Sequence, residues 1–261
     1  MSAWEFANGN VVVLYCRPED WGDDDDTGIE SSVTLVLGIR ASDGILLAAD
    51  GRVVGNVSIA LSDEAQKLYG LGRFGLGFSG SYAFWSDNLK LLQRAKVLER
   101  CADIDEAENA SRKFLVDHYL AGRPDDVTMA KWPAVEMLIA GYDKAGESSI
   151  RCLHSKTGFS TERARGEIGT EAGQVCMQVI RGLLGDETLR FTLEQATVFA
   201  AMALRAAMRV DFRVGGRIRM ATVKPDAGYV NLDYQDCVYD HHLQRNPFEE
   251  LREMIRKGTW E

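Results

Sequence analysis

The segment Ser32–Asp50 constrains the fold more than any other part of this sequence, because it predicts a β-hairpin. Two apolar runs, Val33–Ile39 and Ile45–Ala49, are separated by the turn sequence Ala41–Gly44. Asp-Gly between two runs of β-forming residues is a strong sign of a hairpin. The second run ends at Asp50, so a carboxylate is expected at the end of the hairpin away from the turn.

A hydroxyl and an ammonium are spaced to meet this carboxylate. If the hairpin is centred near Ser42, Thr34 falls opposite Asp50 on the paired strand. Lys67 follows Asp50 by seventeen residues and precedes another apolar run. A lysine beside a buried carboxylate stays charged and favours ionisation of a neighbouring hydroxyl. We therefore expect Thr34, Asp50 and Lys67 to share one small site.

The rest of the chain alternates pairs of strands with pairs of helices. The predicted strands are 74–78, 135–140, 149–153, 218–223 and 228–232, and the predicted helices are 82–101, 104–120, 171–184 and 193–209. This order predicts an α+β fold in which two stacked antiparallel sheets are covered by helices on both sides.

Charge divides the chain near residue 33. Residues 1–33 hold eight acidic side chains, including Asp23–Asp26, against the single base Arg17, although the net charge of the whole chain is only −9. Such a run of like charges is typical of a solvated linker. We expect residues 1–33 to be an N-terminal extension or a pro-segment, with a short strand near 10–16, and residues 34–261 to form one domain.

Composition predicts a cytoplasmic protein. The five cysteines are scattered, with no C-x-x-C pair, as expected for reduced thiols. No basic segment followed by an apolar run begins the chain, and the longest apolar stretch, Ala196–Met208, is interrupted by Arg205. We expect no membrane span, and no nucleic-acid partner because no basic stripe is present. We also expect no cofactor and no metal. His241 and His242 with Asp236 and Asp240 are the candidate ligands, but adjacent histidines on a loop point apart and no third ligand is suitably spaced.

Around Thr34, Asp50 and Lys67 the chain resembles the β-type subunits of the proteasome family, which are N-terminal nucleophile hydrolases. Thr34, Gly44 and Asp50 keep the spacings of the family's catalytic threonine, hairpin glycine and aspartate. Lys67 matches the catalytic lysine with one inserted residue, and Gly80 matches the oxyanion-hole glycine with one deleted residue. The likeness continues through Ile168–Thr170 and Asp211–Gly216, and covers roughly residues 32 to 232.

The resemblance implies a four-layer αββα sandwich and a threonine endopeptidase. Thr34, freed at its amine by removal of residues 1–33, would be both nucleophile and base. Asp50 and Lys67 would supply charge, and Gly80 would hold the oxyanion. The remaining implied site residues are Arg52 after the aspartate, Thr170 and Asp211 around the amine, and Val53, Ala65, Tyr69 and Phe78 in the substrate pocket.

The pocket residues are uncharged, which favours apolar or aromatic substrate side chains. An equally open alternative is that the bulk of Tyr69 and Phe78 narrows the pocket to small side chains. The resemblance further implies a polypeptide substrate and a ring-shaped homo-oligomer, and it leaves an ATPase or activator partner open.

Two alternatives remain from the sequence. Val33 replaces the glycine that usually precedes the threonine, Leu35 replaces a second threonine, and Val214 replaces a serine near the amine. These departures suit a noncatalytic ring subunit or pseudo-enzyme that retains its pro-segment. The other alternative is an amidase with a small-molecule substrate.

Overall fold

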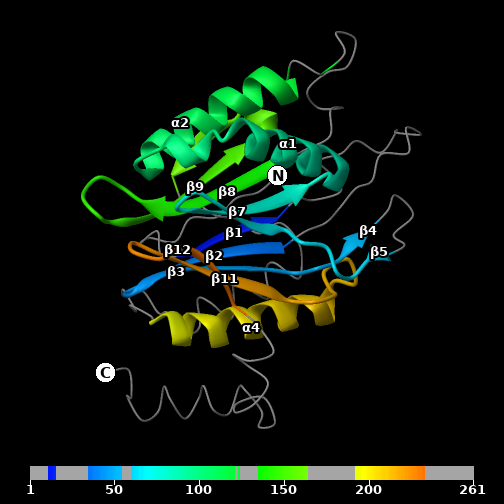
Figure 1. The fold of residues 1–261 in the computed structure, drawn as a ribbon. Coiled ribbons are helices and arrows are strands. Elements are labelled where there is room, and N and C mark those ends of the chain that lie inside the picture. The colour runs from blue at the N-terminus through cyan, green and yellow to red at the C-terminus, as the bar shows by residue number, and fades with distance from the viewer. Residues whose placement is uncertain are drawn as a thin grey trace.

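The computed structural model describes residues 11–15, 35–54, 60–120, 123, 135–163 and 192–232. Within them, two sheets of five antiparallel strands lie face to face (Figure 1). The first sheet has the order β1 (Val11–Tyr15), β2 (Leu35–Ala41), β3 (Gly44–Ala49), β11 (Arg219–Lys224) and β12 (Gly228–Leu232). The second has the order β10 (Ser160–Arg163), β9 (Ser148–His154), β8 (Val135–Tyr142), β7 (Phe74–Gly80) and β6 (Leu68–Leu71). A small pair, β4 (Val53–Val54) and β5 (Ala60–Ser62), lies beside them.

Helices cover the outer faces of both sheets (Figure 1). The second sheet is covered by α1 (Tyr82–Ala95) and α2 (Ile104–Leu115), and the first is covered by α4 (Leu193–Val210). Short helical turns follow at 98–100, 116–120 and 155–157. The α+β class and the αββα layering expected from the sequence are thus confirmed. Among the described helices, none has the length and hydrophobicity that crossing a bilayer requires.

Alternating side chains of the strands fill three apolar layers. On β2, Leu35, Leu37 and Ile39 pack toward α4, whereas Val36 faces the second sheet. The layer between the sheets also contains Leu47 and residues of β8 and β9. Most of strand β2 is therefore buried on both faces.

Two helices start or stop for local reasons that the periodicity did not reveal. The predicted helix 82–101 ends at Ala95 because Lys96 adopts a left-handed conformation, with φ of 51°. At the start of α4, the side chain of Thr192 accepts a hydrogen bond from the backbone of Gln195, whose side chain caps Thr192 in return. Asp43, at the tip of the β2–β3 hairpin, accepts the N–H of Leu193. The helix expected at 171–184 lies outside the described residues.

Strand β1 lies within the part of the chain that we expected to be an extension. Its five residues pair antiparallel with β2, from Val11 opposite Ile39 to Tyr15 opposite Leu35. The backbone of this segment is thus part of the first sheet, and β1 ends beside the start of β2.

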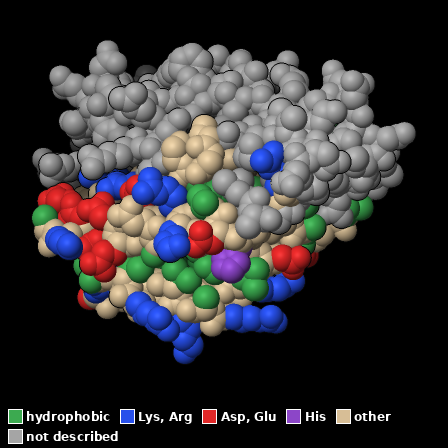
Figure 2. Space-filling model, turned by 90° about the horizontal axis from the view of Figure 1, so that it is seen from above, with side chains coloured by type: hydrophobic (Ala, Val, Ile, Leu, Met, Phe, Trp, Pro, Cys, Tyr) green, Lys and Arg blue, Asp and Glu red, His purple; other side chains and the backbone are tan. Residues whose placement is uncertain are grey.

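The face formed by α1 and α2 carries both signs of charge. Figure 2 shows acidic and basic side chains interspersed over its described part. The ion pairs Lys90–Asp87 and Lys113–Asp117 contribute to this pattern, and their side chains are at least half exposed. Exposed pairs of this kind add little stability.

Candidate active site

Asp50 follows the last residue of β3 and is completely buried. One carboxylate oxygen accepts hydrogen bonds from the backbone N–H of Leu35 at 3.0 Å and from Lys67 Nζ at 2.9 Å. The other oxygen accepts from the backbone N–H groups of Arg52 and Gly215, each at 3.1 Å. Four donors around one carboxylate replace the water that it loses on burial.

Lys67 is also buried, with 1% of its side chain exposed. Besides Asp50, its ammonium donates to the carbonyl oxygen of Arg52 at 2.6 Å. Burial lowers the pKa of Lys67, and the contact with Asp50 opposes that effect. The carbonyl oxygen of Lys67 accepts the N–H of Phe78 at 3.0 Å, so the β6–β7 pairing holds the lysine in place.

The register of the hairpin differs by one residue from the expected one. Residues Ala41 and Gly44 pair directly across a two-residue turn, so the hairpin is centred between Ser42 and Asp43. Consequently Asp50 lies beside Leu35: the backbone N–H of Asp50 donates to the carbonyl oxygen of Leu35, and the N–H of Leu35 donates to the Asp50 carboxylate. The expectation that Thr34 lies directly opposite Asp50 was therefore wrong, because it placed the turn half a residue too early.

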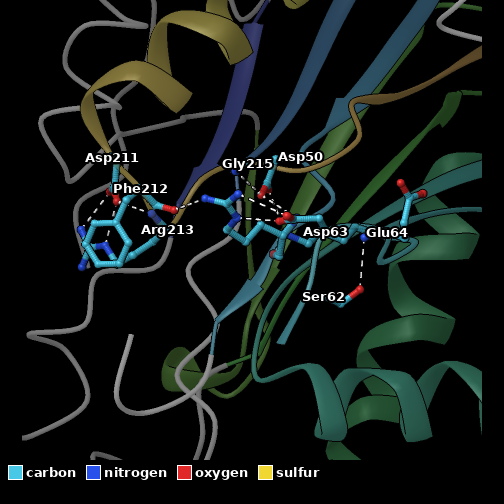
Figure 3. Close-up of polar contacts among 10 residues, drawn as sticks. Asp50, Ser62, Asp63, Glu64, Asp211, Phe212, Arg213 and Gly215 are labelled. Atoms are coloured by element: carbon cyan, nitrogen blue, oxygen red, sulfur yellow. Dashed lines mark hydrogen bonds and ion pairs between the residues drawn. The ribbon is translucent and has the colours of Figure 1, made fainter. Parts of the chain in front are cut away.

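Arg52 joins two separate loops at this end of the sheet. Its guanidinium donates to both carboxylate oxygens of Asp63, at 2.7 and 3.3 Å, and to the carbonyl oxygen of Phe212. Figure 3 shows Asp63 on one side of Asp50 and Phe212 on the other. The hydrogen bond between Arg52 and Asp63 raises the pKa of Arg52 and lowers the pKa of Asp63. Arg52 therefore ties the loop after α4 to the strand region around Asp50.

The loop 211–216 turns sharply after α4. Asp211 ends the helix, and its carboxylate accepts two hydrogen bonds from the guanidinium of Arg213, at 2.9 and 2.8 Å (Figure 3). The carbonyl oxygen of Asp211 accepts the N–H of Val214 at 3.0 Å. These contacts bring Gly215 to Asp50, so the loop completes the binding of the buried carboxylate.

Of the other site residues expected from the sequence, Gly80 is described by the structure and several are not. Gly80 ends β7 with φ of 98°, which favours glycine. Its strand pairs with β8, where Gly80 is opposite Val135. Thr34 and Thr170 lie outside the described residues, as do His241 and His242. Within the described ranges, no group of His, Cys, Asp and Glu side chains is arranged to hold a metal ion.

Comparison with known proteins decides the family. A model of the proteasome subunit family matches residues 31–223. The chain belongs to the proteasome subunit family. Among solved structures it is similar to "Anbu (ancestral beta-subunit) from Yersinia bercovieri", with a TM-score of 0.56 and 16% identity over 85% of this chain and 92% of that chain. This likeness shows a shared fold. A search of curated proteins found no match.

In this proteasome-family fold, the four expected pocket residues form two groups. Val53 and Ala65 are small, buried and close to the Asp50 loop, since the N–H of Ala65 donates to Gly51. Tyr69 and Phe78 belong to an aromatic cluster. The ring of Phe78 stacks on Trp85 with centroids 5.2 Å apart, and Tyr69 contacts both rings edge-on. Trp85 therefore packs against both of these pocket residues.

Some contacts of this proteasome-family site carried no signal in the sequence. The resemblance in the sequence includes the Asp211–Gly216 segment, but nothing in it indicates that the N–H of Gly215 donates to Asp50. Asp63 was also missed, because nothing in its local sequence indicates that it faces Arg52. A search for acidic residues in the loop after Arg52 would have found it only as one of two candidates, beside Glu64.

Gly216 offers a test of how closely this loop must approach Asp63. Its φ is 71°, and a Cβ there would lie 2.3 Å from the backbone oxygen of Asp63. We expect Gly216→Ala to destabilise the protein by roughly 3 kcal/mol or more, since backbone atoms must move. The control Gly146→Ala has a similar φ of 81° but nothing within 4 Å of the new Cβ, so it should cost about 1 kcal/mol. Urea unfolding measures both, and equal losses would show that steric approach to Asp63 is unimportant.

Proposed function

We propose that this protein is a threonine endopeptidase in which Thr34 is both nucleophile and base after residues 1–33 are removed. The observation that carries the proposal is the binding of Asp50. Its carboxylate contacts both Lys67 and the N–H of Leu35, the residue that follows Thr34. A buried ion pair one residue from a threonine is the electrostatic support that a hydroxyl nucleophile needs.

The chemistry uses the free amine of Thr34. The amine takes the hydroxyl proton while the oxygen attacks the substrate carbonyl carbon, and the positive charge of Lys67 favours a neutral amine and a negative oxygen. The backbone N–H of Gly80 would bind the oxyanion, an interaction worth about 3–4 kcal/mol in another hydrolase. The protonated amine of Thr34 then gives its proton to the leaving amine of the substrate. Water hydrolyses the acyl-enzyme and releases the acyl group from Thr34.

Three further residues would support Thr34 rather than react. Asp211 and Thr170 would lie around the amine, and Arg52 would hold the loop that carries Asp211. The contact from Arg52 to the carbonyl oxygen of Phe212 supports this role, because Phe212 directly follows Asp211. The pairing of Asp211 with Arg213 fixes the direction of the carboxylate.

Pocket shape suggests which substrates fit. Val53, Ala65, Tyr69 and Phe78 would line the site for the residue before the scissile bond. Because Phe78 and Tyr69 are already packed against Trp85, we expect this wall to be rigid and the accepted side chain to be small and apolar.

We further propose a cytoplasmic, ring-shaped homo-oligomer acting on polypeptides, because the family generally forms rings. An ATPase or activator would bind such a ring as a separate partner.

A second candidate function is a noncatalytic ring subunit that keeps its pro-segment. The pairing of β1 with β2 favours it, because removal of residues 1–33 would leave β2 as an open edge unless the cut segment stays bound. Val33, immediately before the cleavage point, also favours it, since a β-branched side chain hinders a tight turn.

Intact mass of the purified oligomer distinguishes these functions. The peptidase predicts a chain that begins at Thr34, with a fragment of residues 1–33 either lost or retained without a covalent bond. Hydrolysis of a fluorogenic peptide with a small apolar residue before the reporter should accompany the cut chain. A chain that keeps Met1 or Ser2 in an assembled ring, without hydrolysis, would support the noncatalytic subunit instead.

A further inference from the structure

Three buried side chains of the second sheet form a cluster that the proposed peptidase does not use. Cys152 and His154 lie two residues apart on β9 and so share one face of the sheet. Glu136, on β8, is the register partner of His154. Cys152, His154 and Glu136 are exposed by only 1%, 3% and 1%.

The imidazole of His154 lies between the other two groups. Its Nδ1 is 3.1 Å from Glu136 Oε1, and its Nε2 is 3.2 Å from Cys152 Sγ. When Nδ1 donates its hydrogen to Glu136 Oε1, Nε2 is the ring nitrogen that faces the sulfur of Cys152. A nucleophile beside a base that a third group orients is the arrangement that activates a thiol.

The groups around His154 favour its protonated form. Burial alone would lower the pKa of His154, but the neighbouring Cys152 sulfur and the Glu136 carboxylate raise it to about 11. An imidazolium next to the sulfur stabilises a thiolate, which is the reactive form of cysteine.

Packing alone does not account for the cluster. Buried charges carry a desolvation cost that apolar side chains of similar volume avoid. Among the described residues, Glu136 Oε2 has no hydrogen-bond partner, and neither has the buried hydroxyl of Ser79, its register partner on β7. Unsatisfied buried polar atoms of this kind call for a chemical explanation.

We propose that Cys152 is a thiolate that reacts with hydrogen peroxide, with His154 as proton donor and Glu136 as the positioning residue for His154. The thiolate attacks one peroxide oxygen, so that an S–O bond forms and the O–O bond breaks. Sulfur is oxidised by two electrons to a sulfenic acid, and peroxide is reduced. The proton on Nε2 of His154 passes to the leaving hydroxide, which departs as water.

Cys101 is an internal control, because it is more exposed than Cys152 whereas the proposal makes Cys152 the more readily ionised thiol. Cys101 is partly exposed, and its thiol donates to the carbonyl oxygen of Val97. Burial raises the pKa of Cys101, and Glu106 and Asp103 raise it further. If exposure governed oxidation, Cys101 would react first; the proposal requires Cys152 to react first.

The test treats the full-length protein with hydrogen peroxide and measures oxidation of each cysteine-containing peptide by mass spectrometry over time. We expect Cys152 to be oxidised faster than Cys101, whereas a bulky maleimide should label Cys101 faster, because Cys152 is almost fully buried. Faster peroxide oxidation of Cys101 in the unchanged protein would overturn the proposal.

Two variants separate activation from access. His154→Gln leaves Cys152 equally buried but removes the positive charge that stabilises its thiolate, so its oxidation rate should fall at least about tenfold. Glu136→Gln retains the shape and should also slow the reaction. Thermal unfolding checks that each variant is folded. If His154→Gln does not fold, the oxidation rate of Cys152 in Glu136→Gln is the deciding measurement. An unchanged rate at Cys152 in a folded variant would contradict the proposal.

Discussion

Lys67→Met should destabilise the protein by about 3 kcal/mol and abolish peptide hydrolysis, because it leaves Asp50 charged and buried without its counterion. Three backbone donors to Asp50 remain, from Leu35, Arg52 and Gly215, so the loss should lie at the lower end of the range for broken buried pairs. Urea unfolding and a fluorogenic peptide assay measure the two effects separately.

Lys90→Met is the matched control. Lys90 also pairs with an aspartate at 2.9 Å, but its side chain is 60% exposed, so its loss should change stability by less than about 0.5 kcal/mol. A double variant, Asp50→Asn with Lys67→Met, should be less destabilised than the two single losses together, since no unpaired charge remains. If Lys67→Met were as stable as Lys90→Met, burial of the pair would not contribute as argued.

Local turn chemistry made the essential part of this site predictable. The Asp43-Gly44 sequence and its flanking apolar runs located the β2–β3 hairpin, and the hairpin placed Asp50 at its open end. Lys67 was found by spacing alone, and the structure brings its ammonium to Asp50. Register was harder to predict, because one residue at the turn moves every partner along β2.

Contacts between distant segments could not be predicted. Gly215 meets Asp50 across 165 residues, through a loop whose path depends on where α4 ends. Similarly, His154 and Glu136 are neighbours only because β8 and β9 pair in one particular register. A sequence lists such residues without stating which strands lie side by side, so their chemistry becomes visible only in the fold.

Thr34→Ala should reduce peptide hydrolysis at least about 1,000-fold, since no other group replaces a missing nucleophile. The same variant should retain the Val33–Thr34 bond if Thr34 cuts its own preceding peptide. Its stability should be close to that of the unprocessed parent, because Lys67 and the backbone N–H of Leu35 still donate to Asp50.

Thr34→Ser is the informative comparison. Serine keeps a hydroxyl and, once cut, an amine, so partial hydrolysis should remain and a chain beginning at residue 34 should appear by intact mass. Loss of activity in Thr34→Ala with partial activity in Thr34→Ser identifies the hydroxyl as the reacting group. Equal activity in both variants would assign hydrolysis to another residue, and the Asp50–Lys67 pair would then be a structural element of a noncatalytic subunit.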